Sequence, residues 1–304
     1  MPALPVRLLH TLSAGSGIHS LAVAGNGRAV AGSRDGAITV WDVADRRKLR
    51  SFPTGHEIFL SLDIFDEGKY AVSGGLRRLR LWDLESGRAV REIDTSADDV
   101  KVLTAGPNGT CLSGHRYGGI LVWDLNTGKR LANLEAVETT AFSRIMADPD
   151  EVTAMRLTAD GQRLVAGSSK GFLRVWDLWA RRCLHVLQAH CLDVTGIVVP
   201  PNGLRGLSAS WDGSIKSWAL EKDTASSRLF EGKVGINCLD LLPGGDTAVW
   251  GTESGELCFW DMAIGAVRES VKAHAKAVNR VAVWKDDYVL SASEDGTLKL
   301  WSGK

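Results

Sequence analysis

Short segments in which apolar and polar residues alternate recur along the whole chain, and many end in a tryptophan followed by aspartate. Residues 37–43 and 79–84 are two such segments, and residues 120–125 and 173–178 repeat their form. Alternation with a period of two is typical of β-strands, because successive side chains point to opposite faces of a sheet. One tryptophan marks each repeat: Trp41, Trp82, Trp123, Trp176, Trp218, Trp260 and Trp301. The intervals between them, of 41, 41, 53, 42, 42 and 41 residues, predict a repeated structural unit.

Turn signals separate the alternating segments. Asp-Gly pairs precede the tryptophan segment, as at Asp35-Gly36 and Asp212-Gly213, and Ser86-Gly87 follows one of them. Such pairs favour tight hairpins, because glycine adopts the left-handed conformation easily. Two further alternating segments lie upstream in each unit, for example at residues 278–284 and 288–293. Each unit is therefore predicted to supply four short antiparallel strands, which makes the fold all-β.

The repeat resembles the WD40 family, whose blades of about 40–45 residues carry a Trp-Asp signature. Five of the seven marker tryptophans are followed by aspartate, and the exceptions are Trp218-Ala219 and Trp301-Ser302. The resemblance covers the whole chain. It implies that residues 1–304 form one domain, a seven-bladed β-propeller.

The last repeat lacks a fourth strand, because the sequence ends three residues after Trp301. Residues 7–12 align with residues 182–187, which are expected to form the outer strand that follows Trp176. We therefore expect residues 5–12 to complete blade 7 together with residues 272–304. This pairing would cover an otherwise open sheet edge.

Two blades carry histidine, serine, aspartate and tryptophan at repeat spacing. The resemblance implies that each set forms a hydrogen-bonded chain within its blade, since buried polar groups need partners. A Ser-His-Asp hydrolase is the alternative, but neither serine lies on a nucleophile elbow. The two sets are His190, Ser208, Asp212 and Trp218 in blade 5, and His274, Ser291, Asp295 and Trp301 in blade 7.

Other candidate chemistry is sparse. Residues 167–171 match the Gly-x-Ser-x-Gly pattern, but they are expected in a hairpin between strands rather than at a strand-to-helix elbow. Cys183, His185, His190 and Cys191 have side chains that zinc favours, yet the resemblance already places His190 in a structural chain. We expect no cofactor, no metal site and no enzymatic activity.

Composition excludes several other classes. The 36 basic residues balance 36 acidic ones, which disfavours nucleic acid as a partner because nucleic-acid binders usually carry a basic excess. No apolar stretch approaches the roughly 20 residues that a membrane-spanning helix needs, so no membrane partner is expected. The five cysteines form no Cys-x-x-Cys pair and are interpreted as reduced thiols of a cytoplasmic protein.

In a propeller, the inter-blade loops and the hairpins that precede the tryptophan strands share one face, and such loops often carry binding residues. Trp211 is the leading candidate, because a turn tip does not require a large apolar group; the alternative is that it lies flat on its own blade. Glu151, Asp193 and Glu253 are acidic candidates on the same loops. The partner-binding residues predicted first are Trp211, Arg34, Phe59, Arg116, Tyr117, Lys170, Arg78, Phe142 and Met146.

The interval of 53 residues indicates an insertion near residues 135–151, where Phe142, Ile145 and Met146 could form one apolar helical face that either contacts a partner or folds back onto the ring. The hairpins of blades 1 to 4 are basic and those of blades 6 and 7 acidic, so an acidic partner segment would fit the first half.

The predicted function is a non-enzymatic scaffold or adaptor that binds a protein or peptide on the loop face, as a subunit of a multiprotein complex. A substrate-recognition or regulatory subunit of a larger enzyme complex is one alternative. A propeller enzyme with a site in the central channel is another, although Asp63, Lys101, Arg156, Asp240 and Arg280 alone interrupt the apolar innermost strands. Contact of nucleic acid with the basic side of the ring is a third.

Overall fold

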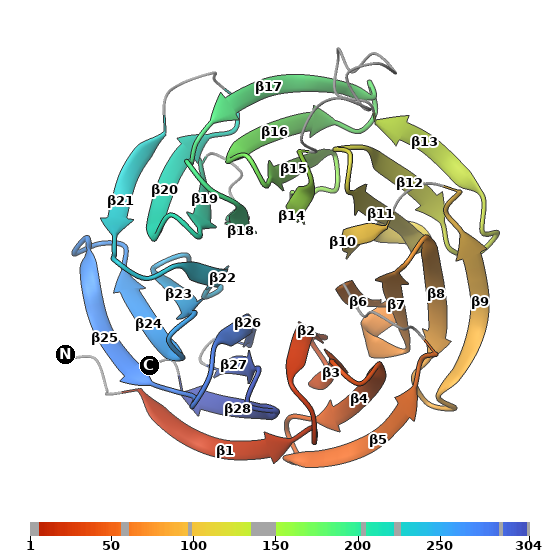
Figure 1. Ribbon diagram of the computed structural model, residues 1–304, viewed down its shortest axis with the longest axis horizontal. Helices are drawn as coiled ribbons and strands as arrows, with labels where there is room; N and C mark the ends of the chain where they lie inside the picture. The colour runs from red at the N-terminus through yellow and green to blue at the C-terminus, as the bar shows by residue number, and fades with distance from the viewer. Residues whose placement is uncertain are drawn as a thin grey trace.

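A computed structural model describes residues 6–55, 61–96, 99–134, 150–201, 205–221, 226–285 and 288–302. Within these ranges the strands form seven four-stranded antiparallel sheets, arranged as blades around a central axis (Figure 1). In blades 1 to 6 the first strand lies nearest the axis and the last strand outermost, and in blade 7 the N-terminal strand of the chain is outermost (Figure 1). The predicted seven-bladed all-β propeller is therefore confirmed.

The strands follow the chain from blade to blade. Blade 1 has β2 (Ile18–Val23), β3 (Arg28–Ser33), β4 (Ala37–Asp42) and β5 (Arg47–Pro53). Blade 2 has β6 (Ser61–Phe65), β7 (Tyr70–Gly75), β8 (Arg78–Asp83) and β9 (Arg88–Asp94). Blade 3 has β10 (Val100–Ala105), β11 (Thr110–His115), β12 (Ile120–Asp124) and β13 (Arg130–Leu134). The 3-10 turns η1 (Asp66–Gly68) and η2 (Pro107–Gly109) join the first two strands of blades 2 and 3.

The second half of the ring repeats this order. Blade 4 has β14 (Val152–Leu157), β15 (Arg163–Ser168), β16 (Phe172–Asp177) and β17 (Arg182–Gln188). Blade 5 has β18 (Val194–Val198), β19 (Arg205–Ser210), β20 (Ser214–Ala219) and β21 (Ser227–Glu231). Blade 6 has β22 (Ile236–Leu241), β23 (Thr247–Thr252), β24 (Glu256–Asp261) and β25 (Ala266–Lys272). Blade 7 has β26 (Val278–Trp284), β27 (Tyr288–Ser293) and β28 (Thr297–Ser302).

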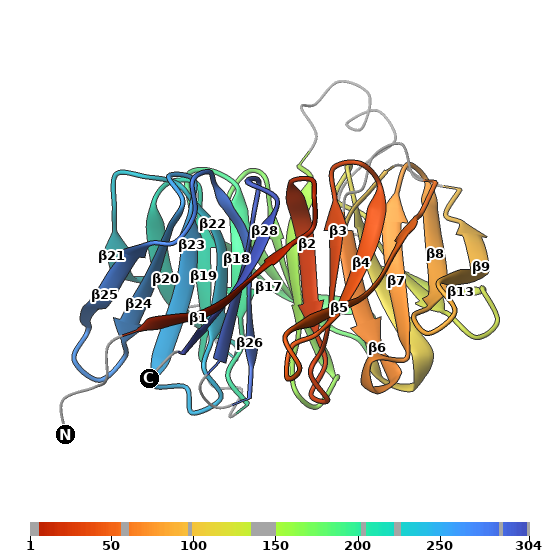
Figure 2. The same ribbon diagram turned by 90° about the horizontal axis from the view of Figure 1, so that it is seen from below.

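The N-terminal strand β1 (Arg7–Ser13) closes the ring. It pairs antiparallel with β28, so that the last sheet has the order β1-β28-β27-β26, and the two perpendicular views agree on this placement (Figures 1 and 2). Leu8 lies opposite Trp301 and Leu12 opposite Leu298. Residues from the two ends of the sequence thus share one sheet, as the alignment of residues 7–12 predicted.

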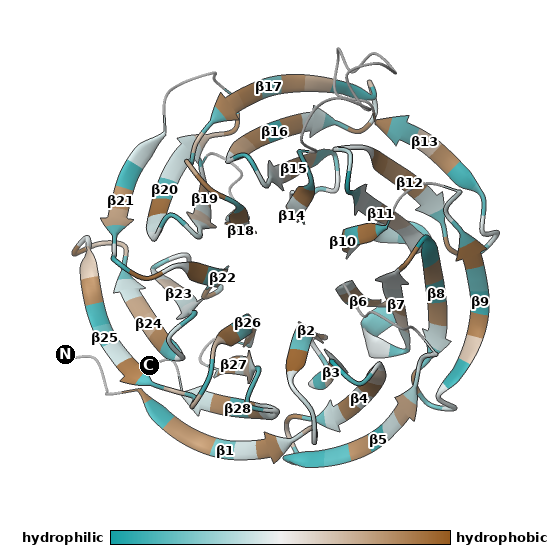
Figure 3. Cartoon of the chain, viewed as in Figure 1, coloured by the Kyte–Doolittle hydropathy of each residue, from teal (hydrophilic) through white to brown (hydrophobic). Residues whose placement is uncertain are grey.

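Neighbouring blades pack closely because a glycine lies where the second strand of one blade meets the first strand of the next. An added Cβ at Gly114 would lie 2.6 Å from Val152 Cγ1, and one at Gly167 would lie 2.5 Å from Val194 Cγ1. Real side chains do not approach so closely, so the contact requires glycine. Figure 3 shows apolar residues distributed through the strands of every blade, and the buried clusters join residues of adjacent blades.

The predicted polar chain is complete in blade 7. The Trp301 indole donates to Ser291 Oγ at 2.8 Å, the Ser291 hydroxyl lies 2.7 Å from His274 Nε2, and His274 Nδ1 lies 3.0 Å from Asp295. Burial lowers the pKa of His274, so the imidazole is neutral and its Nδ1 proton is donated to the carboxylate. Because Ser291 is fully buried, its hydroxyl is not accessible to a substrate.

Blade 5 differs from the prediction at its tryptophan. His190 Nδ1 lies 3.1 Å from Asp212 and His190 Nε2 lies 2.8 Å from Ser208 Oγ, but the Trp218 indole N–H has no hydrogen-bond partner in the described part of the chain. Burial opposes ionisation of Asp212, yet hydrogen bonds from Ser214 and Cys191 lower the pKa of the carboxyl to about 2. The chain therefore ends at Ser208.

Blade 3 contains a polar chain that the sequence did not predict. The Trp123 indole donates to Ser113 Oγ at 2.8 Å, and Ser113 Oγ lies 2.9 Å from His115 Nε2. The histidine follows the serine on β11 instead of preceding it in an inter-blade loop, so it falls outside the spacing shared by blades 5 and 7.

Candidate functional site

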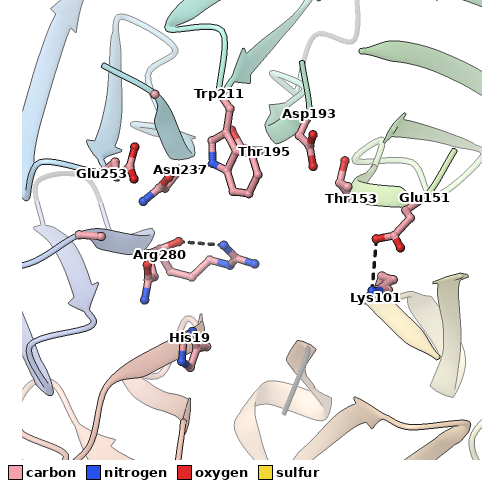
Figure 4. A pocket seen from close by; sticks show the side chains of 13 residues that line it. His19, Lys101, Glu151, Thr153, Asp193, Thr195, Trp211, Asn237, Glu253 and Arg280 are labelled. Carbon is pink, nitrogen blue, oxygen red and sulfur yellow. Dashed lines mark hydrogen bonds and ion pairs between the residues drawn. The ribbon is translucent and has the colours of Figure 1, made fainter. Parts of the chain in front are cut away.

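A cavity of about 620 Å³ lies at the mouth of the central channel, and six of its thirteen lining residues are β-bulge residues. Six innermost strands begin with a bulge, in which one extra residue is left out of the ladder. A bulge redirects its side chain, and here it directs these side chains toward the channel. The bulge residues that line the cavity are His19, Lys101, Thr153, Thr195, Asn237 and Asn279, of which Figure 4 labels the first five.

Several bulge side chains also connect neighbouring blades. Thr153 Oγ1 donates to the carbonyl of Val194 at 2.7 Å, and Thr195 Oγ1 donates to that of Ile236 at 2.6 Å. Asn279 Nδ2 makes the equivalent bond across the ring closure, to the carbonyl of Ile18. The cavity wall is therefore held by bonds between blades, which gives it a defined shape.

Trp211 lies above this wall, on the hairpin between β19 and β20. Its backbone N–H donates to the carbonyl of Asp193, and its indole N–H donates to Asn237 Oδ1 of blade 6 at 3.0 Å. The side chain is nevertheless 54% exposed. The indole thus bridges to the next blade at the cavity mouth instead of lying on its own blade.

Most charges around the cavity are paired. Lys101 Nζ lies 3.2 Å from a Glu151 carboxylate oxygen, and Arg116 Nε lies 3.5 Å from the other oxygen. Glu294 lies 3.0 Å from Arg34 Nη1 and 3.3 Å from His19 Nε2. These pairs occupy the wall formed by blades 1, 3 and 7.

Two carboxylates beside Trp211 differ from these paired charges. Asp193 and Glu253 line the cavity on either side of the indole (Figure 4), and among the described residues neither has an ion-pair partner. Burial raises the pKa of Asp193, and the nearby Glu151 and Asp150 carboxylates raise it further. The wall of blades 5 and 6 is therefore aromatic and acidic, and no cation in the described part of the chain forms an ion pair with these two carboxylates.

The predicted partner-binding residues are only partly brought together. Trp211 lines the cavity, while Arg34 and Arg116 lie just outside it and reach it through Glu294 and Glu151. Tyr117 and Lys170 are exposed on their hairpins without lining the cavity.

Lys170 lies on the blade 4 hairpin, one position after Ser169, the residue equivalent to Trp211, whose N–H donates to Glu151. One hairpin assignment needs correction. Arg78 lies in β8 and pairs with Glu92 at 2.7 Å, because the hairpin ends one residue earlier than expected. Phe59, Phe142 and Met146, with most of the insertion at 135–151, lie outside the described residues.

The bulge residues were missed, apart from Lys101, although a signal was present. Each follows a buried apolar residue at the start of its strand, and the positions 153, 195, 237 and 279 recur every 42 residues. The alternation of apolar and polar residues does not reveal a bulge, because an extra residue shifts the alternation by one position.

Within the described residues, no group of three or more histidine, cysteine, aspartate or glutamate side chains is arranged to hold a metal ion. The same part of the chain contains no helix with the length and apolar character needed to cross a bilayer. Cys183, one of the residues considered for zinc, is engaged with the carbonyl of His185.

Similarity to known proteins agrees with this architecture. Residues 61–244, more than half of the chain, match the family described as nucleolar protein 10-like, N-terminal domain. Residues 6–42 and 265–302 match the family described as WD domain, G-beta repeat.

Relatives from plants and yeast show the same likeness. Autophagy-related protein 16 of Arabidopsis thaliana is 27% identical over 62% of this chain and 35% of its own length. Protein ROOT INITIATION DEFECTIVE 3 of the same plant is 29% identical over 68% of this chain and 49% of its own length. Target of rapamycin complex subunit wat1 of Schizosaccharomyces pombe is 24% identical over 76% of this chain and 73% of its own length.

The chain thus spans between about a third and a half of the first two relatives. The repeats, the blades and the two family matches lead to one conclusion. The chain belongs to the WD40-repeat β-propellers and, through residues 61–244, to the nucleolar protein 10-like N-terminal-domain family.

Proposed function

We propose that this protein is a non-enzymatic interaction scaffold that binds a protein or peptide partner at the mouth of its central channel. One observation carries the proposal: Trp211 is held in place by Asn237 and still exposes 54% of its surface beside a cavity of about 620 Å³. Fixed, exposed tryptophans at the edge of a cavity are typical binding hot spots, since little conformational entropy is lost when a partner covers them.

The relatives support a role within a larger assembly. One of them carries a name that describes it as a subunit of the target of rapamycin complex, and this chain covers 73% of that protein. We propose that this chain also works as a subunit of a multiprotein complex. A cytoplasmic location and a regulatory or substrate-recognition role within an enzyme complex stay predictions.

The test compares two exposed tryptophans. Trp211→Ala removes the proposed hot spot, and Trp179→Ala is a matched control, because Trp179 is 94% exposed on the hairpin between β16 and β17. This hairpin lies at the opposite end of blade 4 from the β15–β16 hairpin, which is the counterpart of the β19–β20 hairpin in blade 5. Each immobilised variant is incubated with lysate, and the retained proteins are quantified by mass spectrometry.

We expect Trp211→Ala to lose partners that wild type and Trp179→Ala both retain, with affinity reduced about 30-fold or more. Thermal unfolding of all three proteins shows whether the fold is intact. If a correctly folded Trp211→Ala protein retains every partner at wild-type levels, the proposed binding face is wrong.

A further inference from the structure

We propose that the segment captured at this mouth presents a lysine or arginine side chain directly beside an apolar one; this inference rests on the proposed function and specifies its partner. Trp211 with Asp193 and Glu253 would receive the cation. A ridge formed by Leu192, Trp211 and Val234 would receive the apolar side chain.

The apolar ridge consists of three large, exposed side chains, and the chain segments that carry them lie next to one another. Leu192 is 50% exposed, Trp211 54% and Val234 39%. The carbonyl of Leu192 accepts a hydrogen bond from Ser210, the residue before Trp211. On the other side, a Cβ added at Gly235, next to Val234, would lie 3.5 Å from the Trp211 ring. Contiguous exposed apolar side chains mark interaction surfaces.

The acidic groups adjoin this ridge directly. Asp193 follows Leu192 in the chain, and its carbonyl holds the backbone of Trp211. Glu253 occupies the equivalent position to Trp211 on the next blade, where its N–H donates to Gly235. Figure 4 shows the indole between the two carboxylates. A cation placed here would meet a negative group on each side and the face of an aromatic ring, an arrangement that favours lysine or arginine.

An anionic ligand is the competing occupant, because Lys101 and Arg280 also line the cavity. Lys101 lies on the opposite wall and is already paired with Glu151. Arg280 donates to the carbonyl of Asn279 at 2.8 Å. The charged residues that line the cavity are three carboxylates, Glu151, Asp193 and Glu253, and two cations, Lys101 and Arg280, so the lining carries a net negative charge. The balance around Trp211 therefore favours a basic segment.

The experiment selects binders without presuming a sequence. A phage-displayed library of random dodecapeptides is selected on the full chain, with removal of phage that also bind the Trp211→Ala variant. The expected result is enrichment of lysine or arginine next to leucine, isoleucine or phenylalanine, relative to the unselected library. Fluorescence anisotropy then measures the affinity of the most enriched peptide.

Removing the negative charge from the protein or the positive charge from the peptide should weaken binding by a similar factor. We expect the double variant Asp193→Asn/Glu253→Gln to bind this peptide about tenfold more weakly, and added salt to reduce the difference. A peptide with its basic residue replaced by glutamine should lose as much on wild type and little on the double variant. Glu85→Gln, which removes one carboxylate on the hairpin between β8 and β9, should bind like wild type.

The outcomes separate the two proposals. Binders that depend on Trp211 but are acidic or uncharged would overturn the basic-segment inference and leave the binding face in place. The same holds if the double variant binds the selected basic peptide as well as wild type does. Absence of any Trp211-dependent binder would overturn both proposals.

Discussion

The Ser291 hydroxyl satisfies two buried groups of blade 7 at once. It accepts the Trp301 indole N–H at 2.8 Å and lies 2.7 Å from His274 Nε2. Replacement by alanine leaves both groups without a partner, in a place that water does not reach because Ser291 is fully buried. Each unsatisfied buried group costs about 1–3 kcal/mol. Ser291→Ala should therefore lower the free energy of unfolding by about 2–6 kcal/mol.

Blade 5 supplies a matched comparison. Ser208 occupies the equivalent position and lies 2.8 Å from His190 Nε2, but the Trp218 indole makes no bond to it. Ser208→Ala leaves one group unsatisfied instead of two, so the expected loss is about 1–3 kcal/mol. The difference between the variants isolates the contribution of the indole hydrogen bond.

Urea denaturation followed by circular dichroism measures both losses. Stability should fall in the order wild type, Ser208→Ala, Ser291→Ala, with the slope of the transition unchanged. Ser13→Ala, at an exposed position of β1, should shift stability by less than about 0.5 kcal/mol. Equal losses for Ser208→Ala and Ser291→Ala would refute the reasoning, since the Trp301 bond would then contribute nothing.

Three further predictions follow from the same contacts. The Trp176 indole has no hydrogen-bond partner among the described residues, and Ala166→Ser gives it a hydroxyl at the position equivalent to Ser291. This variant should raise stability in urea by about 1 kcal/mol, and an unchanged or lower midpoint would contradict the prediction. Deletion of residues 1–13 removes β1 and exposes β28, so thermal unfolding should begin at a lower temperature and lose cooperativity. A truncated chain that melts like the full one would show that β1 does not stabilise the ring. Burial lowers the pKa of His190 and His274 below the ordinary 6.5, so the unfolded chain binds more protons and stability should fall as pH drops below 6.5. Replacing both histidines by glutamine should flatten this pH dependence of stability, measured by urea titrations at several pH values. The same pH dependence in wild type and variant would count against the prediction.

The number of blades and their closure were predictable because they depend on local features that repeat. Trp41 and Trp176 are fully buried at equivalent positions, so the packing of each blade requires a large apolar residue at a fixed interval. The alignment of residues 7–12 with residues 182–187 identified the closing strand because outer strands share one pattern of exposure. Sequence spacing records such requirements directly.

The candidate site was predictable only in part, because its geometry depends on contacts between blades. Trp211 was identified as out of place in a turn, but its bond to Asn237 connects residues 26 positions apart on different blades. The bulges that aim Thr195 and Asn237 into the channel leave no mark in the alternation of apolar and polar residues. Charge pairing also decides the site: Arg34 is prominent in the sequence, yet Glu294 neutralises it.

Asn237 shows how the ring combines stability with recognition. At the equivalent position, Thr153, Thr195 and Asn279 each donate to the first strand of the next blade. Asn237 instead uses its side-chain oxygen to accept the indole N–H of Trp211 from the preceding blade. The same backbone bulge therefore holds blades together at three of its six occurrences and fixes an exposed aromatic ring at another. Because a bulge sets the direction of a side chain but not its chemistry, the repeat can change one residue and create a binding surface without altering the ring.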